Sequence, residues 1–407
     1  MPGRIRRARG ILPANVRALG WVSFANDLAS ELAYPIVPLF VTITLGAPVA
    51  VMGLIEGLAE GASVGLRGLS GWLSDREGGR RKPWIVGGYA ATAASRPLLA
   101  AAPAWGWVLG ARLVDRAGKA ARTAPRDALI RDSTPPAIIG SAFGYHRAMD
   151  TAGAVIGPLA AVALLALGLS LRGVLWVTIV PALATLLLLR TVREAPAAAA
   201  TATGRPKARL RDLPTPFWLV LGIWVTFSIG NSSDVFLLLR AHELGLGTTL
   251  AVLSYAAYNT VYSGLAWPLG SLSDRVPRTL VLGAGIAVFA LVYLGFAVAP
   301  AAWAVWPLFL VYGGYMAATE GVAKAWVADY APPGLAGTAY GVFAAASGGA
   351  LLIASIVAGQ LWTRVSPSAP FVLGAATAAV ALLLLGAFEL SAYSLWRNDD
   401  SSPRCDG

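Results

Sequence analysis

The sequence of 407 residues is poor in charged side chains, histidine and cysteine. Charged residues make up 13% of it, about half the share found in soluble proteins, so a soluble fold is excluded. The single cysteine, Cys405, lies in the C-terminal tail, which leaves no intrachain disulfide and no thiolate metal site. The chain also has no nucleophile-elbow serine, no glycine-rich phosphate loop and no metal-spaced histidine pair, so we expect neither an enzyme nor a bound cofactor.

Apolar residues fill the chain instead, at 57% of the total and with a mean hydropathy of +0.64. Stretches long enough to cross about 30 Å of hydrocarbon recur along it. They predict an all-α membrane protein with twelve spans, at 19–43, 48–72, 83–102, 104–126, 140–166, 172–190, 214–240, 248–271, 277–299, 302–328, 337–362 and 369–391.

Lysine and arginine gather in alternate connections between these spans, whereas 46–50, 101–104 and 299–302 carry no charge. Because basic loops stay in the cytoplasm, we expect both termini on the cytoplasmic side of the cell membrane. The net charge of +11 then reflects topology and not nucleic-acid binding, for which no basic soluble domain exists. The basic residues are Arg4, Arg6, Arg7 and Arg9, then Arg76, Arg80, Arg81 and Lys82, and finally Arg190, Arg193, Arg205, Lys207, Arg209 and Arg211.

Two short sequences occur twice. Gly71-Trp-Leu-Ser-Asp75-Arg76 recurs 199 residues later as Gly270-Ser-Leu-Ser-Asp274-Arg275. The run from Asp132 through Pro135, Pro136, Gly140 and Gly144 recurs 197 residues later from Asp329. Two anchors at nearly one offset indicate a duplication. We therefore expect two six-helix halves, 1–190 and 214–407, joined by a cytoplasmic linker at 191–213.

The duplicated Gly-x-Leu-Ser-Asp-Arg resembles motif A of the major facilitator superfamily, a family of twelve-helix secondary transporters with two pseudo-symmetric halves. Residues 111–130 and 143–158 look like an uncharacterised prokaryotic branch of it. The resemblance implies that Asp75 and Arg76 close the cytoplasmic side, with Asp127 or Asp132 as the paired carboxylate and the start of span eleven as the helix dipole. The other gating candidates are Gly71, Arg80, Gly270, Asp274 and Arg275.

The chain departs from motif A at two places: an extra Gly79 displaces the basic run, and Pro277 stands where a glycine is usual. The second copy is therefore the weaker candidate for a gate. In span five, Gly153, Gly157 and Pro158 resemble motif C, which is associated with export by antiport. Small residues four apart let two helices approach closely, so these positions also suit packing.

Ionisable residues inside spans are costly and normally face a cavity or a partner. They are concentrated in the first half, where many are spaced one helical turn apart. One interpretation is a proton-coupling site, which we favour for the carboxylates of spans one and two. The other is a structural ion-pair network. Both are equally compatible with the stripe of charges on one face of span four, formed by Arg112, Asp115, Lys119, Arg122 and Arg126. The coupling candidates are Asp27, Glu31, Glu56, Glu60, Arg112, Asp115, Lys119, Arg122, His146 and Asp150.

The second half carries neutral or aromatic residues at the equivalent positions, such as Tyr255 for Glu56, Asn259 for Glu60 and Phe343 for His146. We expect this half to supply much of the substrate surface. In span ten, Glu320 and Lys324 lie one turn apart and are expected to pair. The substrate-cavity candidates are Tyr34, Asp234, Tyr255, Tyr258, Asn259, Tyr262 and Glu320.

The expected function is secondary active transport of a small solute or ion by a monomer, through alternating access and with proton-coupled efflux. A metal-ion exporter is an alternative, because Asp27, Glu31, Glu56, Glu60 and Asp150 offer hard oxygen ligands. An importer or a uniporter of the same fold is another. A membrane receptor or enzyme would need a soluble domain or a catalytic group of residues, and the sequence contains neither. The charge of the substrate cannot be read from these residues.

Overall fold

A computed structural model describes residues 12–194, 209–246 and 248–399, which form helices and no β-strand. Nine of the predicted spans are continuous helices within this part of the chain. They are α3 (Val49–Arg76), α4 (Lys82–Ala100), α5 (Trp105–Asp132), α6 (Ile139–Ala166), α11 (Thr248–Ser273), α12 (Arg278–Val298), α13 (Val305–Tyr330), α14 (Ala336–Arg364) and α15 (Ala369–Asp399).

The other three spans are interrupted. The first consists of α1 (Ala14–Ala33), α2 (Ile36–Leu39) and a π-helical turn at Phe40–Thr44; the sixth of α7 (Leu171–Val177) and α8 (Ile179–Leu189); the seventh of α9 (Thr215–Ser228) and α10 (Val235–Glu243). Pro35 and Pro181 explain two of the breaks, because proline has no N–H for the carbonyl four residues earlier. The third break holds the polar run 231–234.

Five helices in the described part of the chain are long and apolar enough, by length and composition alone, to cross a membrane. They are Pro136–Ala166, Leu171–Leu189, Arg278–Val298, Ala336–Arg364 and Ala369–Ser391. Other helices contain ionisable residues, such as Asp27 and Glu31 in α1, which make those helices too polar for this count.

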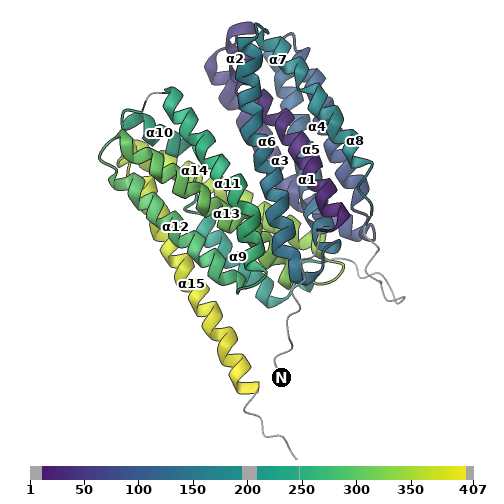
Figure 1. Cartoon of the computed structure of the whole chain (residues 1–407), viewed down its shortest axis with the longest axis vertical. Coiled ribbons are helices and arrows are strands. Elements are labelled where there is room, and N and C mark those ends of the chain that lie inside the picture. The colour runs from purple at the N-terminus through teal and green to yellow at the C-terminus, as the bar shows by residue number, and fades with distance from the viewer. Residues whose placement is uncertain (1–11, 195–208, 247, 400–407) are drawn as a thin grey trace, which may run out of the picture.

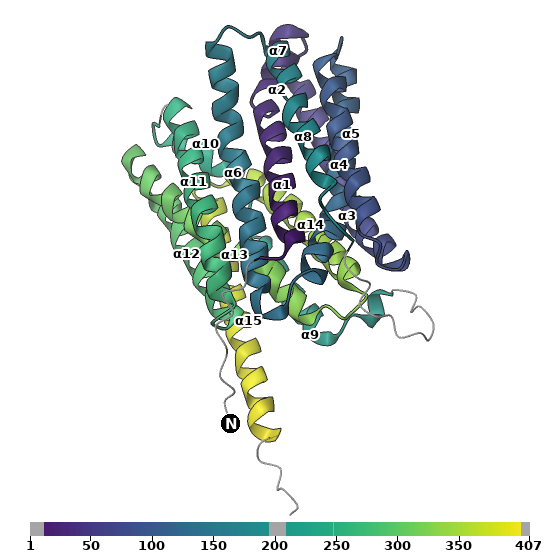
Figure 2. The same cartoon turned by 45° about the vertical axis from the view of Figure 1, so that its right-hand side comes forward.

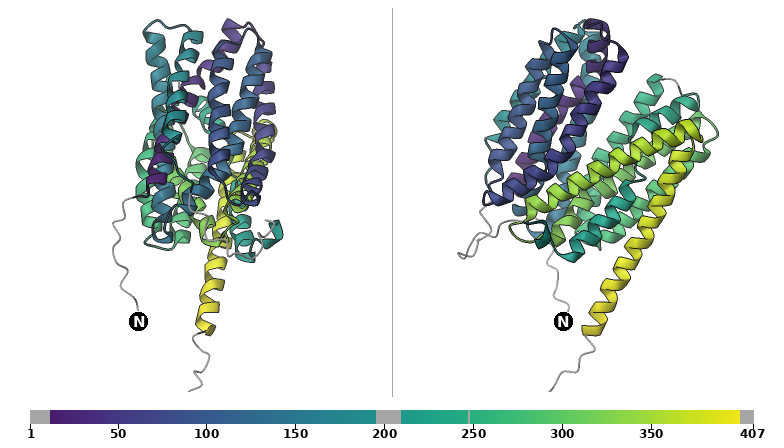
Figure 3. Two further views of the ribbon diagram at one scale, coloured as in Figure 1. Left: turned by 90° about the vertical axis from the view of Figure 1, so that its right-hand side faces the viewer. Right: turned by 180° about the vertical axis from the view of Figure 1, so that it is seen from behind.

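The helices form two bundles, α1–α8 and α9–α15 (Figure 1). The bundles touch at one end, which we call the closed end, and diverge toward the other (Figure 3). At the closed end α1 begins and α15 ends (Figure 2). The predicted all-α, two-half fold is thereby confirmed. That the closed end is cytoplasmic, and that the halves divide at 190 and 213, stay predictions.

Glycines allow the halves to touch at the closed end. A Cβ on Gly71 of α3 would overlap the backbone oxygen of Gly337 in α14, and a Cβ on Gly144 of α6 would lie 2.5 Å from the backbone oxygen of Ala266 in α11. Gly140 and Gly270 meet backbone to backbone in the same way. Each half therefore presents a glycine-lined helix to the other, at equivalent positions in the repeat.

Candidate functional site

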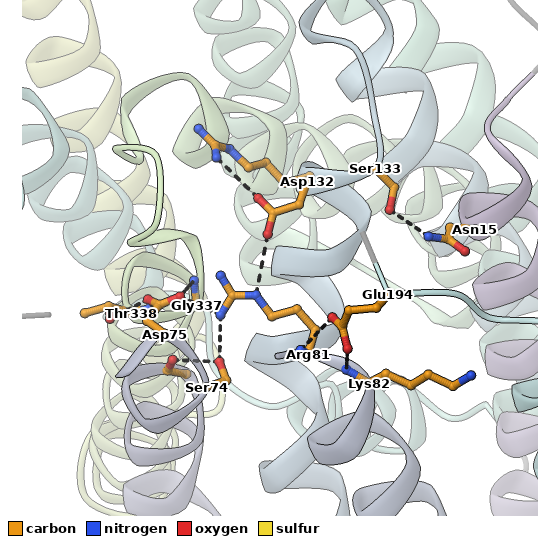
Figure 4. A network of polar contacts seen from close by, with 12 residues as sticks. Asn15, Ser74, Asp75, Arg81, Lys82, Asp132, Ser133, Glu194, Gly337 and Thr338 are labelled. Carbon is orange, nitrogen blue, oxygen red and sulfur yellow. Dashed lines mark hydrogen bonds and ion pairs between the residues drawn. The ribbon is translucent and has the colours of Figure 1, made fainter. Parts of the chain in front are cut away.

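Asp75 joins the end of α3 to the start of α14 in the opposite half (Figure 4). Its carboxylate accepts hydrogen bonds from the backbone N–H of Gly337 at 3.1 Å, the N–H of Thr338 at 2.5 Å and the hydroxyl of Thr338 at 2.6 Å. A carboxylate here also faces the positive end of the α14 dipole. The contact expected between Asp75 and the start of span eleven is thus present.

Asp274 makes the equivalent contact from α11 to the start of α6. It accepts from the N–H of Gly140 at 2.7 Å, the N–H of Ser141 at 2.7 Å and the hydroxyl of Ser141 at 2.6 Å. Pro277 does not disturb it, because that proline precedes α12 and contributes no donor. The expectation of a weaker second copy is therefore wrong for this contact.

The arginine that pairs with Asp75 and with Asp132 is Arg81, so the expectation that Arg76 pairs with Asp132 is wrong. Arg81 is 2% exposed and pairs with Asp75 at 2.5 Å and with Asp132 at 3.5 Å (Figure 4). It also donates to the hydroxyl of Ser74 at 2.8 Å. Arg76 is exposed, and its guanidinium lies 5.0 Å from the centre of the Trp72 ring. Arg76 points outward because α3 ends there and the chain turns back through 77–81.

In the second half, Arg278 takes the place of Arg81. It lies 3.4 Å from Asp274 and 2.7 Å from Asp329, whereas Arg275 is exposed like Arg76. Arg80, another gating candidate, is also exposed. Arg81 and Arg278 differ by 197 positions and the aspartates by 199, because the turn between the helices is two residues shorter in the second half.

The residue that precedes the undescribed linker segment is anchored beside Arg81. Glu194 accepts from the backbone N–H of Arg81 at 2.8 Å and of Lys82 at 3.0 Å, so it caps the first turn of α4 (Figure 4). Asn15 of α1 holds Arg193 through two backbone hydrogen bonds and donates to Ser133 at 2.9 Å. The end of span six is therefore fixed to the first half at the closed end.

Deeper in the interface, ion pairs cross between the halves. Lys324 of α13 lies 2.8 Å from Asp127 of α5, and Arg126 lies 3.1 Å from the same carboxylate. The expected Glu320–Lys324 pair is therefore wrong. Glu320 instead lies 3.6 Å from Arg147 of α6. Asp127 is not the partner of Arg76 either, because α5 buries it against α13.

Arg147 binds groups in both halves. It pairs with Asp150 one turn further along α6 at 2.8 Å, and its Nε donates to the hydroxyl of Tyr262 in α11. Asp150 also accepts from Ser23 of α1 at 2.5 Å. The guanidinium thus links the candidate coupling residue Asp150 to the candidate substrate residues Tyr262 and Glu320.

Asp27 of α1 lies against Asp150, close enough for one carboxyl to hydrogen-bond the other. The motif C glycines make this possible. A Cβ on Gly153 would lie 3.1 Å from the Cβ of Asp27, and one on Gly157 would lie 2.8 Å from the Cβ of Glu31. Asp27 also accepts from Asn26 at 3.0 Å. The α6 helix continues through Pro158.

Most of the span-four stripe is tied to α4. Arg96 pairs with Asp115 at 3.1 Å, and Arg112 lies 3.8 Å from the same carboxylate. Arg122 donates to Thr92 at 2.7 Å and lies 4.2 Å from the centre of the Tyr89 ring. These contacts are those of a structural network, and coupling roles for Arg112, Asp115 and Arg122 stay predictions.

Lys119 differs from its neighbours in the stripe, because it is exposed although it lies in the middle of α5. Its charge acts on Glu31, which is half-buried, and on Asp27. Tyr34, at the end of α1, is exposed as well. A charge facing lipid is costly, but that Lys119 and Glu31 face the central cavity stays a prediction.

In the second half, Asp234 marks the break between α9 and α10. Its carboxylate accepts from the hydroxyls of Tyr258 and Tyr312, each at 2.7 Å. Arg240, the nearest cation in the sequence, pairs with Glu243 at 2.7 Å instead. Asn259 is buried beside Tyr258 on α11. The side chains of Glu56, Glu60 and Tyr255 lie outside the described part of the structure.

No group of three or more His, Cys, Asp or Glu side chains among the described residues is arranged to hold a metal ion. The residues that the sequence missed are Arg81 and Arg278 at the closed end, Ser141 and Thr338 as donors, and Arg96 within the network. The repeat itself contained the signal for four of them, because Arg81 and Arg278, like Ser141 and Thr338, are related by the offset of 197.

Residues 19–352 match the family described as the Major Facilitator Superfamily. An uncharacterised MFS-type transporter of Methanocaldococcus jannaschii is 35% identical over 92% of this chain and 94% of its own length. An uncharacterised protein of Mycobacterium tuberculosis is 33% identical over 83% of this chain and 85% of its own length.

Solved structures share the fold at low identity. The human organic anion transporter MFSD10 superposes with a TM-score of 0.76 at 15% identity, covering 91% of this chain and 99% of its own. The Escherichia coli fucose:proton symporter gives 0.74 at 14% identity, covering 91% and 97%. A family match across most of the chain agrees with the two-half fold and the duplicated Asp75 and Asp274 contacts. The chain belongs to the major facilitator superfamily and is a membrane transporter of that family.

Proposed function

We propose that the protein exports a small solute across the cell membrane in exchange for protons. The Asp27–Asp150 carboxyl pair inside the first half carries the proposal. Two carboxyls this close share a proton more readily than they both ionise, so the pair is a proton-binding site at membrane depth. Because Arg147 joins Asp150 to Tyr262 and Glu320, loading that proton acts on a contact between the halves.

The closed end supports alternating access. The contacts of Asp75 and Asp274 join opposite halves and exist only while this end is shut. Contacts made in one conformation and lost in the other are what set the balance between two states. The direction of transport rests on the resemblance of Gly153, Gly157 and Pro158 to motif C. The substrate surface is assigned to the second half, around Asp234, Tyr258 and Tyr312.

The test uses everted membrane vesicles from cells that express the wild type or Asp150→Asn. The vesicles are energised by respiration and supplied with a cell metabolite extract, and their contents are compared by mass spectrometry. A solute should accumulate in wild-type vesicles only while the pH gradient persists, and Asp150→Asn should abolish that accumulation.

Accumulation that survives collapse of the pH gradient with nigericin would contradict proton coupling and indicate a uniporter or another coupling ion. Loss of a preloaded solute, driven by the same gradient, would indicate an importer. Accumulation of a divalent metal ion instead of an organic solute would support the metal-exporter alternative.

A further inference from the structure

His146 of α6 is a buried histidine on which both the carboxyl of Asp150 and the Asp127–Lys324 ion pair act. It is 2% exposed, and its Nε2 has no hydrogen-bond partner among the described residues. Asp150 follows it by one turn of α6, about 6 Å along the helix axis. Arg126 and Asp127 of α5 and Lys324 of α13 are the other charges that act on its ring.

The repeat shows that packing alone does not require a histidine here. The equivalent residue in α14 is Phe343, whose ring packs against that of Trp224 in α9 with 5.6 Å between the centroids. An aromatic ring therefore fills this place in the fold without nitrogen atoms. What the first half adds is a group that binds a proton, next to Asp150, whose own equivalent is the neutral Ser347.

The Asp127–Lys324 ion pair beside His146 joins the two repeats. Asp127 and Lys324 occupy equivalent positions of the two repeats and pair with each other at 2.8 Å across the interface. A positive charge on His146 would be attracted by Asp127 and repelled by Lys324 and Arg126. It would therefore compete with Lys324 for the carboxylate and weaken the contact that joins α5 to α13.

We infer that His146 is a proton-binding site that passes the charge of the Asp27–Asp150 pair to the Asp127–Lys324 gate. The inference rests on the proposed proton coupling. In the step itself, the proton shared by Asp27 and Asp150 leaves the pair and binds Nε2 of His146. Both carboxyls are then ionised, with Asp150 held by Arg147 and Ser23, and His146 becomes an imidazolium. The imidazolium displaces Lys324 from Asp127, the closed end opens, and the proton leaves to that side.

Other groups around α6 do not take this role. Asp27 of α1 contacts Asp150. Tyr262 of α11 and Glu320 of α13 contact Arg147, and not the Asp127–Lys324 ion pair. Tyr340 of α14 donates its hydroxyl to the backbone oxygen of Lys324 at 3.0 Å and so helps to fix that residue. His146 is the group on which both Asp150 and the Asp127–Lys324 ion pair act.

The experiment needs no substrate. Spin labels are attached at Arg76→Cys and Arg275→Cys, two exposed positions at the closed end, in a chain with Cys405→Ser. Pulsed electron paramagnetic resonance then measures the distance between the halves in lipid nanodiscs from pH 8 to pH 5. One proton that binds the open state better shifts the equilibrium by at most roughly tenfold per pH unit. The range from pH 8 to pH 5 covers several such units, so we expect the open population of the unmutated background to grow roughly tenfold or more.

His146→Phe, which copies the second repeat, and His146→Gln should each hold the open population within twofold across this range. His242→Phe, at the exposed second histidine of the chain, should respond as the background does. A full pH response in His146→Gln, or loss of the response in His242→Phe, would overturn the role of His146 while proton coupling stands. A background without any pH response would instead refute proton control of the gate and with it the proposed function.

Discussion

Asp75 and Asp274 each receive three hydrogen bonds from the opposite half and one arginine from their own. Hydrogen bonds to an ionised carboxylate are roughly twice as strong as neutral ones, and a helix N-terminus adds its dipole. The arginine does not cross the interface. Its part is to orient each carboxylate, since Arg81 and Arg278 also hold Asp132 and Asp329.

Arg81→Gln should therefore open the closed end, and Arg76→Gln should not. Removing one partner of a buried pair costs about 3–5 kcal/mol, and every 1.4 kcal/mol is about tenfold in an equilibrium. The reporter is Ala124→Cys, which is fully buried beside the α3–α14 contact, in a Cys405→Ser chain. Its maleimide labelling should become roughly tenfold faster or more in Arg81→Gln and change less than twofold in Arg76→Gln. Equal rates in the two variants would contradict the assignment of Arg81.

The duplicated motif was enough to select Asp75, the helix that it meets, and Asp274 as its counterpart, because motif and repeat constrain those positions together. It did not name the helix that Asp274 meets. It was not enough to select the arginine. Arg76, Arg80 and Arg81 are close together in sequence, and the turn after α3 alone decides which of them points inward. The Glu320–Lys324 expectation failed for a related reason, since spacing on one helix does not reveal a closer partner on another.

At the scale of helices, glycine decides where backbones touch. The closest contacts between halves place Gly71 on Gly337 and Gly140 on Gly270, and within the first half Gly153 and Gly157 bring α6 against α1. The second set suits both interpretations of motif C. It is a packing device, and it is also what brings Asp27 to Asp150. The helix breaks near Pro35 and Pro181 were not predicted, because an apolar stretch reads as one span whether or not it bends.

Gly71→Ala should separate α3 from α14 at the closed end, because the added Cβ would overlap the backbone oxygen of Gly337. Amide hydrogen exchange over 335–340 reports it directly, since the N–H groups of Gly337 and Thr338 are bound to Asp75. Exchange there should accelerate roughly tenfold or more. Gly87→Ala in α4 is the control, as its Cβ meets nothing within 4 Å. Unchanged exchange in Gly71→Ala would mean that the two helices tolerate a wider contact than the structure has.

At the scale of the molecule, the two halves are unequal copies. The repeat keeps the closed-end contacts, with Ser141 and Thr338, Gly140 and Gly337, and Arg81 and Arg278 in equivalent places. It changes the interior, where His146 and Asp150 correspond to Phe343 and Ser347. Copies that match at the gate and differ in the interior suit a transporter whose halves open symmetrically but in which one half binds the proton.

Composition and repeat predicted the twelve spans and the two halves, because bilayer thickness and duplication constrain sequence strongly. The family was predicted from the resemblance to motif A. Which end of the molecule is shut could not be predicted. Both conformations of an alternating-access transporter use the same sequence, and they differ by contacts whose free energies nearly balance. The pairing of buried charges depends on helix rotation, which hydropathy does not fix.

The central claim is that the halves must separate at the closed end in every transport cycle. Ser141 and Ser271, which face each other across α6 and α11 with their hydroxyl oxygens 3.1 Å apart, provide the test as a Ser141→Cys/Ser271→Cys pair in a Cys405→Ser chain. An Asn15→Cys/Ser133→Cys pair, within the first half, is the control. Oxidising the first pair should abolish gradient-driven solute accumulation in everted vesicles and reduction should restore it, while the control pair transports in both states. Full transport with the engineered disulfide between positions 141 and 271 intact would contradict the account.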